Sequence, residues 1–374
     1  MINQERLIND FMEMVRIDSL SYQEGKFAAY LKAKLQEMGL EVIEDQQAGR
    51  LAGSDTGNII GRLPGKIKDA PPIFFSAHMD TVPLGEGIEP IIKDGVLYSS
   101  GDTVLASDDK AGVAAILEAL RCLQEEEVEH GDVEVLFTVC EETGLLGARY
   151  LDYGLLQAKT GFVLDCAGSP GTIICQAPAH NRIDALIIGK AAHAGMQPEN
   201  GVNAIQVAAK AINRMNLLRI DEETTANVGV IKGGEVTNVV CERVELQAEA
   251  RSLSEEKLCK QTKHMVNCFQ KVCDEMGALL EVKVTREYPA FTLKKEETVV
   301  QIAVEAAQSL GFQVHLTSSG GGSDTNYFCN NGLKVVNLGI GMSHAHTKEE
   351  FIKIEELVRT AHYVTEITRC AAQS

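Results

Sequence analysis

The strongest constraint on the fold is an alternation of amphipathic helix patterns with short apolar runs. Apolar residues recur at helical spacing in residues 7–15 and again in residues 27–38. Four apolar runs and one further helix pattern follow, the runs at residues 58–63, 73–77, 133–139 and 161–164 and the helix at residues 113–120. Strands that alternate with helices in this way predict an α/β sheet.

A different pattern interrupts this alternation between residues 181 and 289. Its order is strand, helix, strand, strand, helix, strand, at residues 183–190, 204–215, 226–232, 244–250, 255–276 and 279–287. That order is the ferredoxin-like βαββαβ unit, which is a complete small domain. The first pattern resumes after Pro289, at residues 298–310, 334–338 and 354–371. We therefore expect a discontinuous α/β domain, residues 1–180 and 290–374, with a domain inserted at residues 181–289.

The composition excludes two classes of partner. The 35 basic and 53 acidic residues give a net charge of −18, and no local basic patch reverses it. Such a chain repels nucleic acids and anionic membrane surfaces. The ten cysteines lie singly, without a C-x-x-C pair, which favours free thiols in a reducing compartment. Because no run approaches 18 apolar residues and no signal-peptide pattern opens the chain, we expect no transmembrane helix and a cytoplasmic location.

The residues that carry chemistry gather directly after predicted strands or before a helix pattern. Open α/β sheets bind their ligands at this edge. The residues are His78, Asp80, Asp108, Asp109, Glu141, Glu142, Asp165, His344 and His346. So many carboxylates at one edge would repel one another, and divalent cations are the most direct way to keep them ionised. Histidine mixed with carboxylate suits zinc, with manganese or cobalt as alternatives.

Spacing indicates separate tasks within two of these pairs. His78 and Asp80 are two residues apart, so their side chains point the same way from an extended segment. Asp80 can therefore orient the imidazole of His78 and raise its basicity, as a ligating histidine normally requires. Glu141 and Glu142 are adjacent, so their side chains diverge. One of them can bind metal while the other faces a water molecule.

These motifs resemble those of the metallopeptidases of the M20 clan. The matching segments occur in family order, at residues 78–83, 107–112, 141–144, 165, 189–201, 237–239 and 346–347. Three further segments, residues 249–253, 320–324 and 337–339, are most similar to the peptidase T-like tripeptidase branch. The resemblance implies a zinc-exopeptidase-like α/β catalytic domain whose inserted ferredoxin-like domain serves as a lid and in dimerisation.

The resemblance also implies a metal centre with two zinc ions. Asp108 would bridge them, and the remaining ligands would be His78, Glu142, Asp165 and His346. Glu141 would be the general base. Asp80, which is expected to orient His78, is counted with Glu141 among the catalytic residues. The peptide bond between Asp108 and Asp109 is expected to be cis. His346 fits the family pattern better than His344, because His346 and Thr347 precede Glu350 at the family's spacing.

Other family positions imply contacts with the substrate. In related dimers the histidine that matches His193 reaches the active site of the partner subunit. Asn238 and Arg251 match residues that hold substrate, and the arginine suits a peptide carboxylate as a bidentate fork. Gly321 and Gly322 lie in a glycine run that lacks the G-K-[ST] ending of a phosphate-binding loop, so close backbone approach to a peptide is the favoured interpretation.

The sequence therefore predicts a dizinc exopeptidase for small peptides, most simply a tripeptide aminopeptidase that acts as a homodimer. A carboxypeptidase or an N-acyl-amino-acid deacylase with the same metal centre is the alternative. A third alternative, a metal-bearing scaffold that binds peptides without cutting them, has no need of a base such as Glu141. A serine hydrolase is excluded by the absence of a G-x-S-x-G elbow, and a dinucleotide enzyme by the absence of G-x-G-x-x-G after the first strand.

Overall fold

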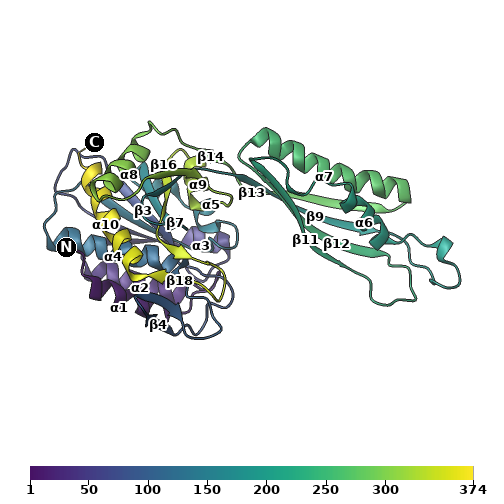
Figure 1. Cartoon of the computed structure of the whole chain (residues 1–374), viewed down its shortest axis with the longest axis horizontal. Coiled ribbons are helices and arrows are strands. Elements are labelled where there is room, and N and C mark those ends of the chain that lie inside the picture. The colour runs from purple at the N-terminus through teal and green to yellow at the C-terminus, as the bar shows by residue number, and fades with distance from the viewer. Residues whose placement is uncertain (374) are drawn as a thin grey trace. The chain divides into compact units, whose positions relative to one another are not determined.

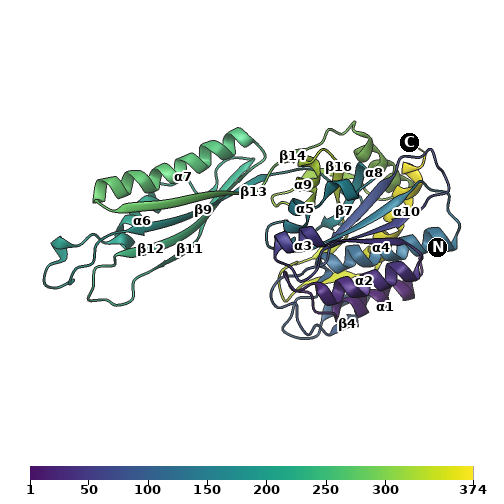
Figure 2. The ribbon, with the colours of Figure 1, turned by 180° about the vertical axis from the view of Figure 1, so that it is seen from behind.

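The structure is a computed structural model that describes residues 1–373. Within them the chain forms two compact units, which Figures 1 and 2 show from opposite sides. The first unit comprises Met1–Gln176, Thr292–Ser319 and the chain from Ser323 onward, and the second comprises Ala177–Phe291 and Gly320–Gly322. Each unit packs around apolar clusters of its own.

A nine-stranded mixed sheet is the centre of the first unit. Its order is β1-β2-β6-β3-β7-β16-β8-β14, with β15 paired to β8. The strands are β1 (Glu41–Asp45), β2 (Asn58–Leu63), β3 (Ile73–His78), β6 (Val133–Thr138), β7 (Thr160–Cys166), β8 (Thr172–Ala177), β14 (Phe291–Thr292), β15 (His315–Ser318) and β16 (Lys334–Gly339). The predicted apolar runs form β2, β3, β6, β7 and β16. Sequence patterning misses β1, β8, β14 and β15. The residues of β1 and β15 are mostly exposed or half-buried and form no apolar run.

Helices cover both faces of this sheet (Figure 1). On one face α4 (Ser107–Glu125) packs on β3 and β7, and α1 (Gln4–Val15) and α10 (Ile354–Ala371) pack on α4. On the other face lie α5 (Leu146–Tyr150) and α9 (Asp324–Asn330), where the Phe328 ring meets Phe74 edge-on with 5.6 Å between centroids. The remaining helices are α2 (Gly25–Glu37), α3 (Gln46–Ala52) and α8 (Thr298–Ser309). This arrangement confirms the predicted α/β class.

A small antiparallel sheet, which the sequence does not predict, lies in the same unit. Its order is β17-β18-β5-β4. The strands are β4 (Pro90–Lys93), β5 (Val96–Ser99), β17 (Met342–Ser343) and β18 (Phe351–Lys353). The loop that joins β17 to β18 carries His346. The sheet therefore provides the base from which His346 is presented.

The second unit has the predicted βαββαβ order with one short additional strand, β10, after its first helix. Its antiparallel sheet is ordered β10-β11-β12-β9-β13 and has α6 and α7 on one face (Figure 2). The elements are β9 (Ala179–Ile188), α6 (Ala204–Asn213), β10 (Leu218–Arg219), β11 (Thr224–Gly233), β12 (Arg243–Ser252), α7 (Glu255–Met276) and β13 (Leu279–Tyr288). Alternate residues of β9, among them Ile183 and Ile187, are fully buried in one cluster with Phe269 of α7. In the part of the chain that the structure describes, no helix has the length and apolar composition of a membrane span.

Candidate active site

Three neighbouring parallel strands bring the predicted ligands to one edge of the large sheet. β6, β3 and β7 lie side by side. His78 is the last residue of β3, Glu141 and Glu142 follow β6, and Asp165 lies at the end of β7. Because the strands are parallel, all these residues come from the same ends of their strands. This is the edge at which open α/β sheets bind ligands.

Asp108 reaches this edge from the beginning of α4. The peptide bond between Asp108 and Asp109 is cis, as the resemblance implies, and neither residue has helical backbone angles. Oδ1 of Asp108 lies 2.9 Å from Nε2 of His78. Asp109 acts on the main chain instead, because its Oδ2 accepts a hydrogen bond from the backbone N–H of His78 at 3.2 Å. The two aspartates therefore hold the imidazole and the backbone of one histidine.

His346 closes the cluster from the loop between β17 and β18. Its Nε2 lies 3.1 Å from Oδ2 of Asp108 and 2.8 Å from Oε1 of Glu142. His344 belongs to the same loop, but its ring packs on Phe351 with 5.8 Å between centroids. The structure therefore brings His346 to the carboxylates and leaves His344 outside their contacts.

Among residues 1–373, three groups of side chains have the spacing that a metal ion requires. In each group, one ligand atom of every residue lies within 4.8 Å of the others. The groups are His78 with Asp108 and Asp165, Asp108 with Glu142 and His346, and His78 with Glu141 and Glu142. Asp108 belongs to the first two groups, as a carboxylate that bridges two ions must. The donors are imidazole nitrogen and carboxylate oxygen, which catalytic zinc uses. The residues therefore fit a pair of divalent cations.

Electrostatics indicate the same chemistry. Burial raises the pKa of Glu141 well above its usual range, and repulsion from Asp165 adds to the effect. Burial and then repulsion from Asp108 do the same to the pKa of Asp165. Hydrogen bonds with Asp108 and Glu142 raise the pKa of His346 to about 10. Since nearby cations favour ionised acids, divalent ions would offset this excess of buried negative charge.

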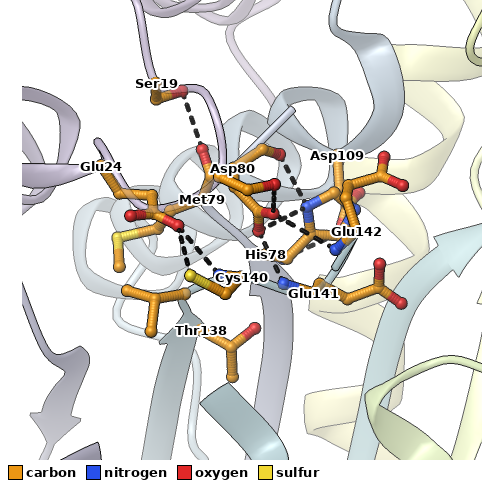
Figure 3. A network of polar contacts seen from close by, with 12 residues as sticks. Ser19, Glu24, His78, Met79, Asp80, Asp109, Thr138, Cys140, Glu141 and Glu142 are labelled. Atoms are coloured by element: carbon orange, nitrogen blue, oxygen red, sulfur yellow. Dashed lines mark hydrogen bonds and ion pairs between the residues drawn. The ribbon is translucent and has the colours of Figure 1, made fainter. Parts of the chain in front are cut away.

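Asp80 supports the site from behind the ligands (Figure 3). Its Oδ1 accepts the backbone N–H of Glu141 at 2.9 Å, and its Oδ2 accepts the N–H of Glu142 at 3.2 Å. Nδ1 of His78 lies 2.8 Å from the main-chain oxygen of Asp80 and 3.5 Å from its Oδ1. The contact predicted between the Asp80 carboxylate and the imidazole is therefore the longer one. The carboxylate mainly fixes the turn that carries the two glutamates.

Two residues that support the site lie in the M20-like segments around residues 337 and 346, but the sequence analysis gives them no role. The buried Glu350 accepts the backbone N–H groups of Leu105, Ala106 and Asp108 and the hydroxyl of Ser107. Asn337 accepts the N–H of Asp165 at 3.1 Å and donates to its carbonyl oxygen at 2.7 Å. The spacing of Glu350 from His346 and the position of Asn337 after a strand are the signals that could have identified them.

The second unit brings two of the predicted substrate residues together. A β-bridge pairs His193 with Val239, and the N–H of Ala194 donates to the carbonyl oxygen of Asn238 at 3.0 Å. Nδ1 of His193 accepts the N–H of Gly195 at 3.2 Å. His193 and Asn238 are both exposed. They therefore present polar groups side by side on the surface of this unit.

Arg251 belongs to a separate polar cluster of the second unit. Its Nε and Nη2 donate to the two carboxylate oxygens of Glu249, each at 3.1 Å. His180 lies across from Arg251 on β9, and its Nε2 is 3.2 Å from Oε2 of Glu249. These contacts with His180 and Arg251 lower the pKa of Glu249 to about 2. The guanidinium therefore has an internal carboxylate as its partner.

The predicted glycines lie against this cluster. The N–H of Gly322 donates to the hydroxyl of Tyr288 at 3.1 Å, and the Tyr288 ring packs edge-on against His180. A Cβ at Gly322 would lie 2.5 Å from the Tyr288 ring, so only glycine fits there. Gly321 precedes it in the same short segment of the second unit. The observed close approach is thus between the glycine backbone and a tyrosine.

Comparison with known proteins identifies the family of the chain. The model of peptidase family M20/M25/M40 matches residues 74–369. The chain belongs to this family. It is an enzyme that hydrolyses peptide bonds, as predicted, and the recognised M20 resemblance is confirmed.

Two solved structures are similar over nearly the whole chain. The aminopeptidase PepT from Bacillus cereus is 45% identical, with a TM-score of 0.92 and coverage of 99% of both chains. A tripeptidase from Staphylococcus aureus is 42% identical, with a TM-score of 0.97 and complete coverage of both chains. Peptidase T from Clostridium botulinum is 26% identical over 98% of this chain and 99% of its own length. The peptidase T-like branch expected from the sequence is therefore the one that these relatives represent.

Proposed function

We propose that this M20 peptidase is a tripeptide aminopeptidase that releases the N-terminal residue of small peptides. The observation that carries the proposal is the pair of ligand groups that share Asp108, with Glu141 in the neighbouring group around His78. The choice of substrate is supported by the PepT aminopeptidase and the tripeptidase, which match the chain almost from end to end.

The proposed cofactors are two zinc ions, with manganese or cobalt as substitutes. One ion would be held by His78, Asp108 and Asp165, and the other by Asp108, Glu142 and His346. When bound, such ions polarise the scissile carbonyl and lower the pKa of the attacking water towards neutrality. The chain itself supplies the remaining chemistry.

Glu141 is the proposed general base and acid. It does not belong to either of the two groups that share Asp108, and it is buried beside them. A buried carboxylate beside these groups can accept a proton from the attacking water and return it to the leaving amine. Asp80 holds the N–H of Glu141 and so fixes the direction of this side chain.

The second unit is the proposed source of substrate contacts. Arg251 can hold a peptide carboxylate with the fork that now binds Glu249. His193 and Asn238 offer exposed polar groups, and Gly321 and Gly322 offer a main chain without side chains. We include a homodimer through this unit and a cytoplasmic location in the proposal. The free thiols of all ten cysteines support a reducing compartment.

Product analysis with one defined tripeptide of three different residues tests the substrate assignment. Metal-reconstituted enzyme should release the N-terminal residue and leave a dipeptide, and acetylation of the N-terminus should stop the reaction. Release of the C-terminal residue would replace the proposal with a carboxypeptidase. Cleavage of N-acyl-amino acids alone would replace it with a deacylase. A metal-loaded protein that cuts none of these substrates would be a binding scaffold.

Mixing two inactive variants tests the dimer. If His193 of one subunit serves the site that contains Glu141 of the other, heterodimers of Glu141→Ala and His193→Ala chains have one site with both residues intact. Peptidase activity should then reappear, up to half that of a wild-type dimer. If mass measurement confirms heterodimers and no activity returns, the shared site is wrong.

A further inference from the structure

We infer that Glu24 is a positioning residue for the two active-site glutamates, although it lies more than a hundred residues before them. Glu24 immediately precedes α2, and its side chain is fully buried. Figure 3 shows its carboxylate beside Cys140, the residue before Glu141. The inference rests on the proposed function, because it concerns the roles of Glu141 and Glu142 in that site.

The contacts of Glu24 identify the group that it holds. Its Oε1 accepts the backbone N–H of Cys140 at 2.9 Å and the thiol of Cys140 at 3.2 Å. The same oxygen accepts the N–H of Tyr22 at 3.1 Å, while Oε2 accepts the hydroxyl of Ser54 at 2.5 Å. All of these donors are uncharged. The carboxylate therefore serves as a hydrogen-bond acceptor for the turn and not as one half of an ion pair.

Glu24 and Asp80 together bind three consecutive N–H groups. Glu24 takes the N–H of Cys140, and Asp80 takes those of Glu141 and Glu142. Cys140 has a φ of +52°, in the left-handed region that residues with a side chain rarely adopt. The backbone at this point is thus unfavourable by its own sterics, and two buried carboxylates hold it in place.

The position of this turn decides where both glutamates point. Glu142 must lie near His346 to share a metal with it. Glu141 must remain outside the two ligand groups that contain Asp108, so that its carboxylate is free to act as the base. Without Glu24, the buried N–H of Cys140 would have no acceptor, and the turn would move to find one. A displacement of about 1 Å at a reacting group can cost about 10²-fold in rate. Glu24 therefore acts on the reaction through Cys140, without touching substrate or metal.

Three variants separate this role from general packing. Glu24→Leu removes both acceptor oxygens at similar volume. Glu24→Gln keeps one oxygen, which can continue to accept the N–H of Cys140. Ser54→Ala is the matched control, because it removes the partner of Oε2 and leaves the Cys140 contact of Oε1 in place. If Glu24→Leu does not fold, Glu24→Asp replaces it, since it draws the oxygens back by one methylene group.

The first measurement is kcat and KM on a tripeptide. The second, independent of activity, is the Co²⁺ affinity of the metal-free protein, determined by competition with a chelating indicator. Glu24→Leu should lower kcat about 10- to 100-fold with little change in KM, and should weaken the weaker Co²⁺ site about 10-fold, as expected for a residue behind a ligand. Glu24→Asp should change both in the same direction. Glu24→Gln should restore both to within about threefold of wild type, and Ser54→Ala should match wild type.

Two results would overturn the inference. One is a Glu24→Leu or Glu24→Asp protein with wild-type kcat and Co²⁺ affinity. The other is a Ser54→Ala protein that loses as much as they do, since the effect would then come from packing around α2. If the wild-type enzyme itself releases no N-terminal residue, the proposed function fails, but the Co²⁺ titration still tests the role of Glu24.

Discussion

Replacement of Glu350 by alanine should release the segment that presents Asp108. The two carboxylate oxygens of Glu350 accept four hydrogen bonds, from the N–H groups of Leu105, Ala106 and Asp108 and from the hydroxyl of Ser107. The side chain is 2% exposed, so solvent does not weaken these bonds in the wild-type protein. Its loss leaves three buried N–H groups of one short segment without their acceptor.

The magnitude follows from those three groups. A buried donor that loses its acceptor costs about 1–3 kcal/mol. Water that enters the space left by the side chain recovers part of this loss, while the Ser107 hydroxyl can rotate to another partner. We therefore expect Glu350→Ala to lower the free energy of unfolding by about 3–5 kcal/mol. Glu350→Gln keeps one acceptor oxygen and should cost about 1–3 kcal/mol.

Urea unfolding followed by circular dichroism measures the loss, with Glu349→Ala as the matched control because Glu349 is the exposed acid next in sequence. The control should change stability by less than about 0.5 kcal/mol. Since two units can unfold separately, hydrogen exchange of residues 105–108 should show that protection is lost in this segment. A Glu350→Ala protein as stable as Glu349→Ala, with residues 105–108 still protected, would refute the reasoning.

Three further predictions concern the metal centre. Metal analysis should find two divalent ions per chain, and full activity at saturation with one ion would contradict this. Glu141→Gln should retain its metal but lose about 10²- to 10⁴-fold in kcat, whereas Glu142→Gln should lose metal first; a near-normal kcat in Glu141→Gln would place the base elsewhere. Hydrogen bonds with Asp108 and Glu142 raise the pKa of His346 from 6.5 to about 10. The ion pairs of protonated His346 therefore stabilise the metal-free protein fully below pH 6.5, and this stabilisation is lost as the pH approaches 10. The Tm difference between metal-free wild type and His346→Gln should therefore shrink from pH 6 to pH 10, and a constant difference would contradict it.

The sequence predicted both the central strands and the ligands that follow them, because these strands are buried in the sheet. β3, β6 and β7 are largely buried, so their residues form mainly apolar runs in spite of Ser76 and Glu134, and the residues that follow them fall at one edge. The order of the second unit was equally clear, because alternate residues of β9 and β12 are buried. The small sheet was missed because its strands have two to four residues and carry no period that a sequence pattern can reveal.

The groups that the supports of the site hold could not be predicted, because most of them are backbone groups. In the sequence, Glu24 and Glu350 are acidic residues beside a helix or a strand, and their side chains do not indicate which N–H groups they accept. Asp80 shows the same limit, since its spacing from His78 suggested an imidazole contact, while the structure gives its carboxylate to Glu141 and Glu142. Such bonds depend on how distant turns meet in three dimensions.

The use of backbone donors has an electrostatic consequence for the centre. Asp80, Glu24 and Glu350 are fixed by neutral N–H and hydroxyl groups, so their support adds no positive charge beside the ligands. Lys110 follows Asp109 directly, but its Nζ donates to the carbonyl oxygen of Ile17 and lies over the Phe27 ring, and burial lowers its pKa to about 7. A lysine or arginine in place of these supports would neutralise the carboxylates and compete with a divalent cation. Rigidity from neutral donors lets the site keep the negative potential that metal binding requires.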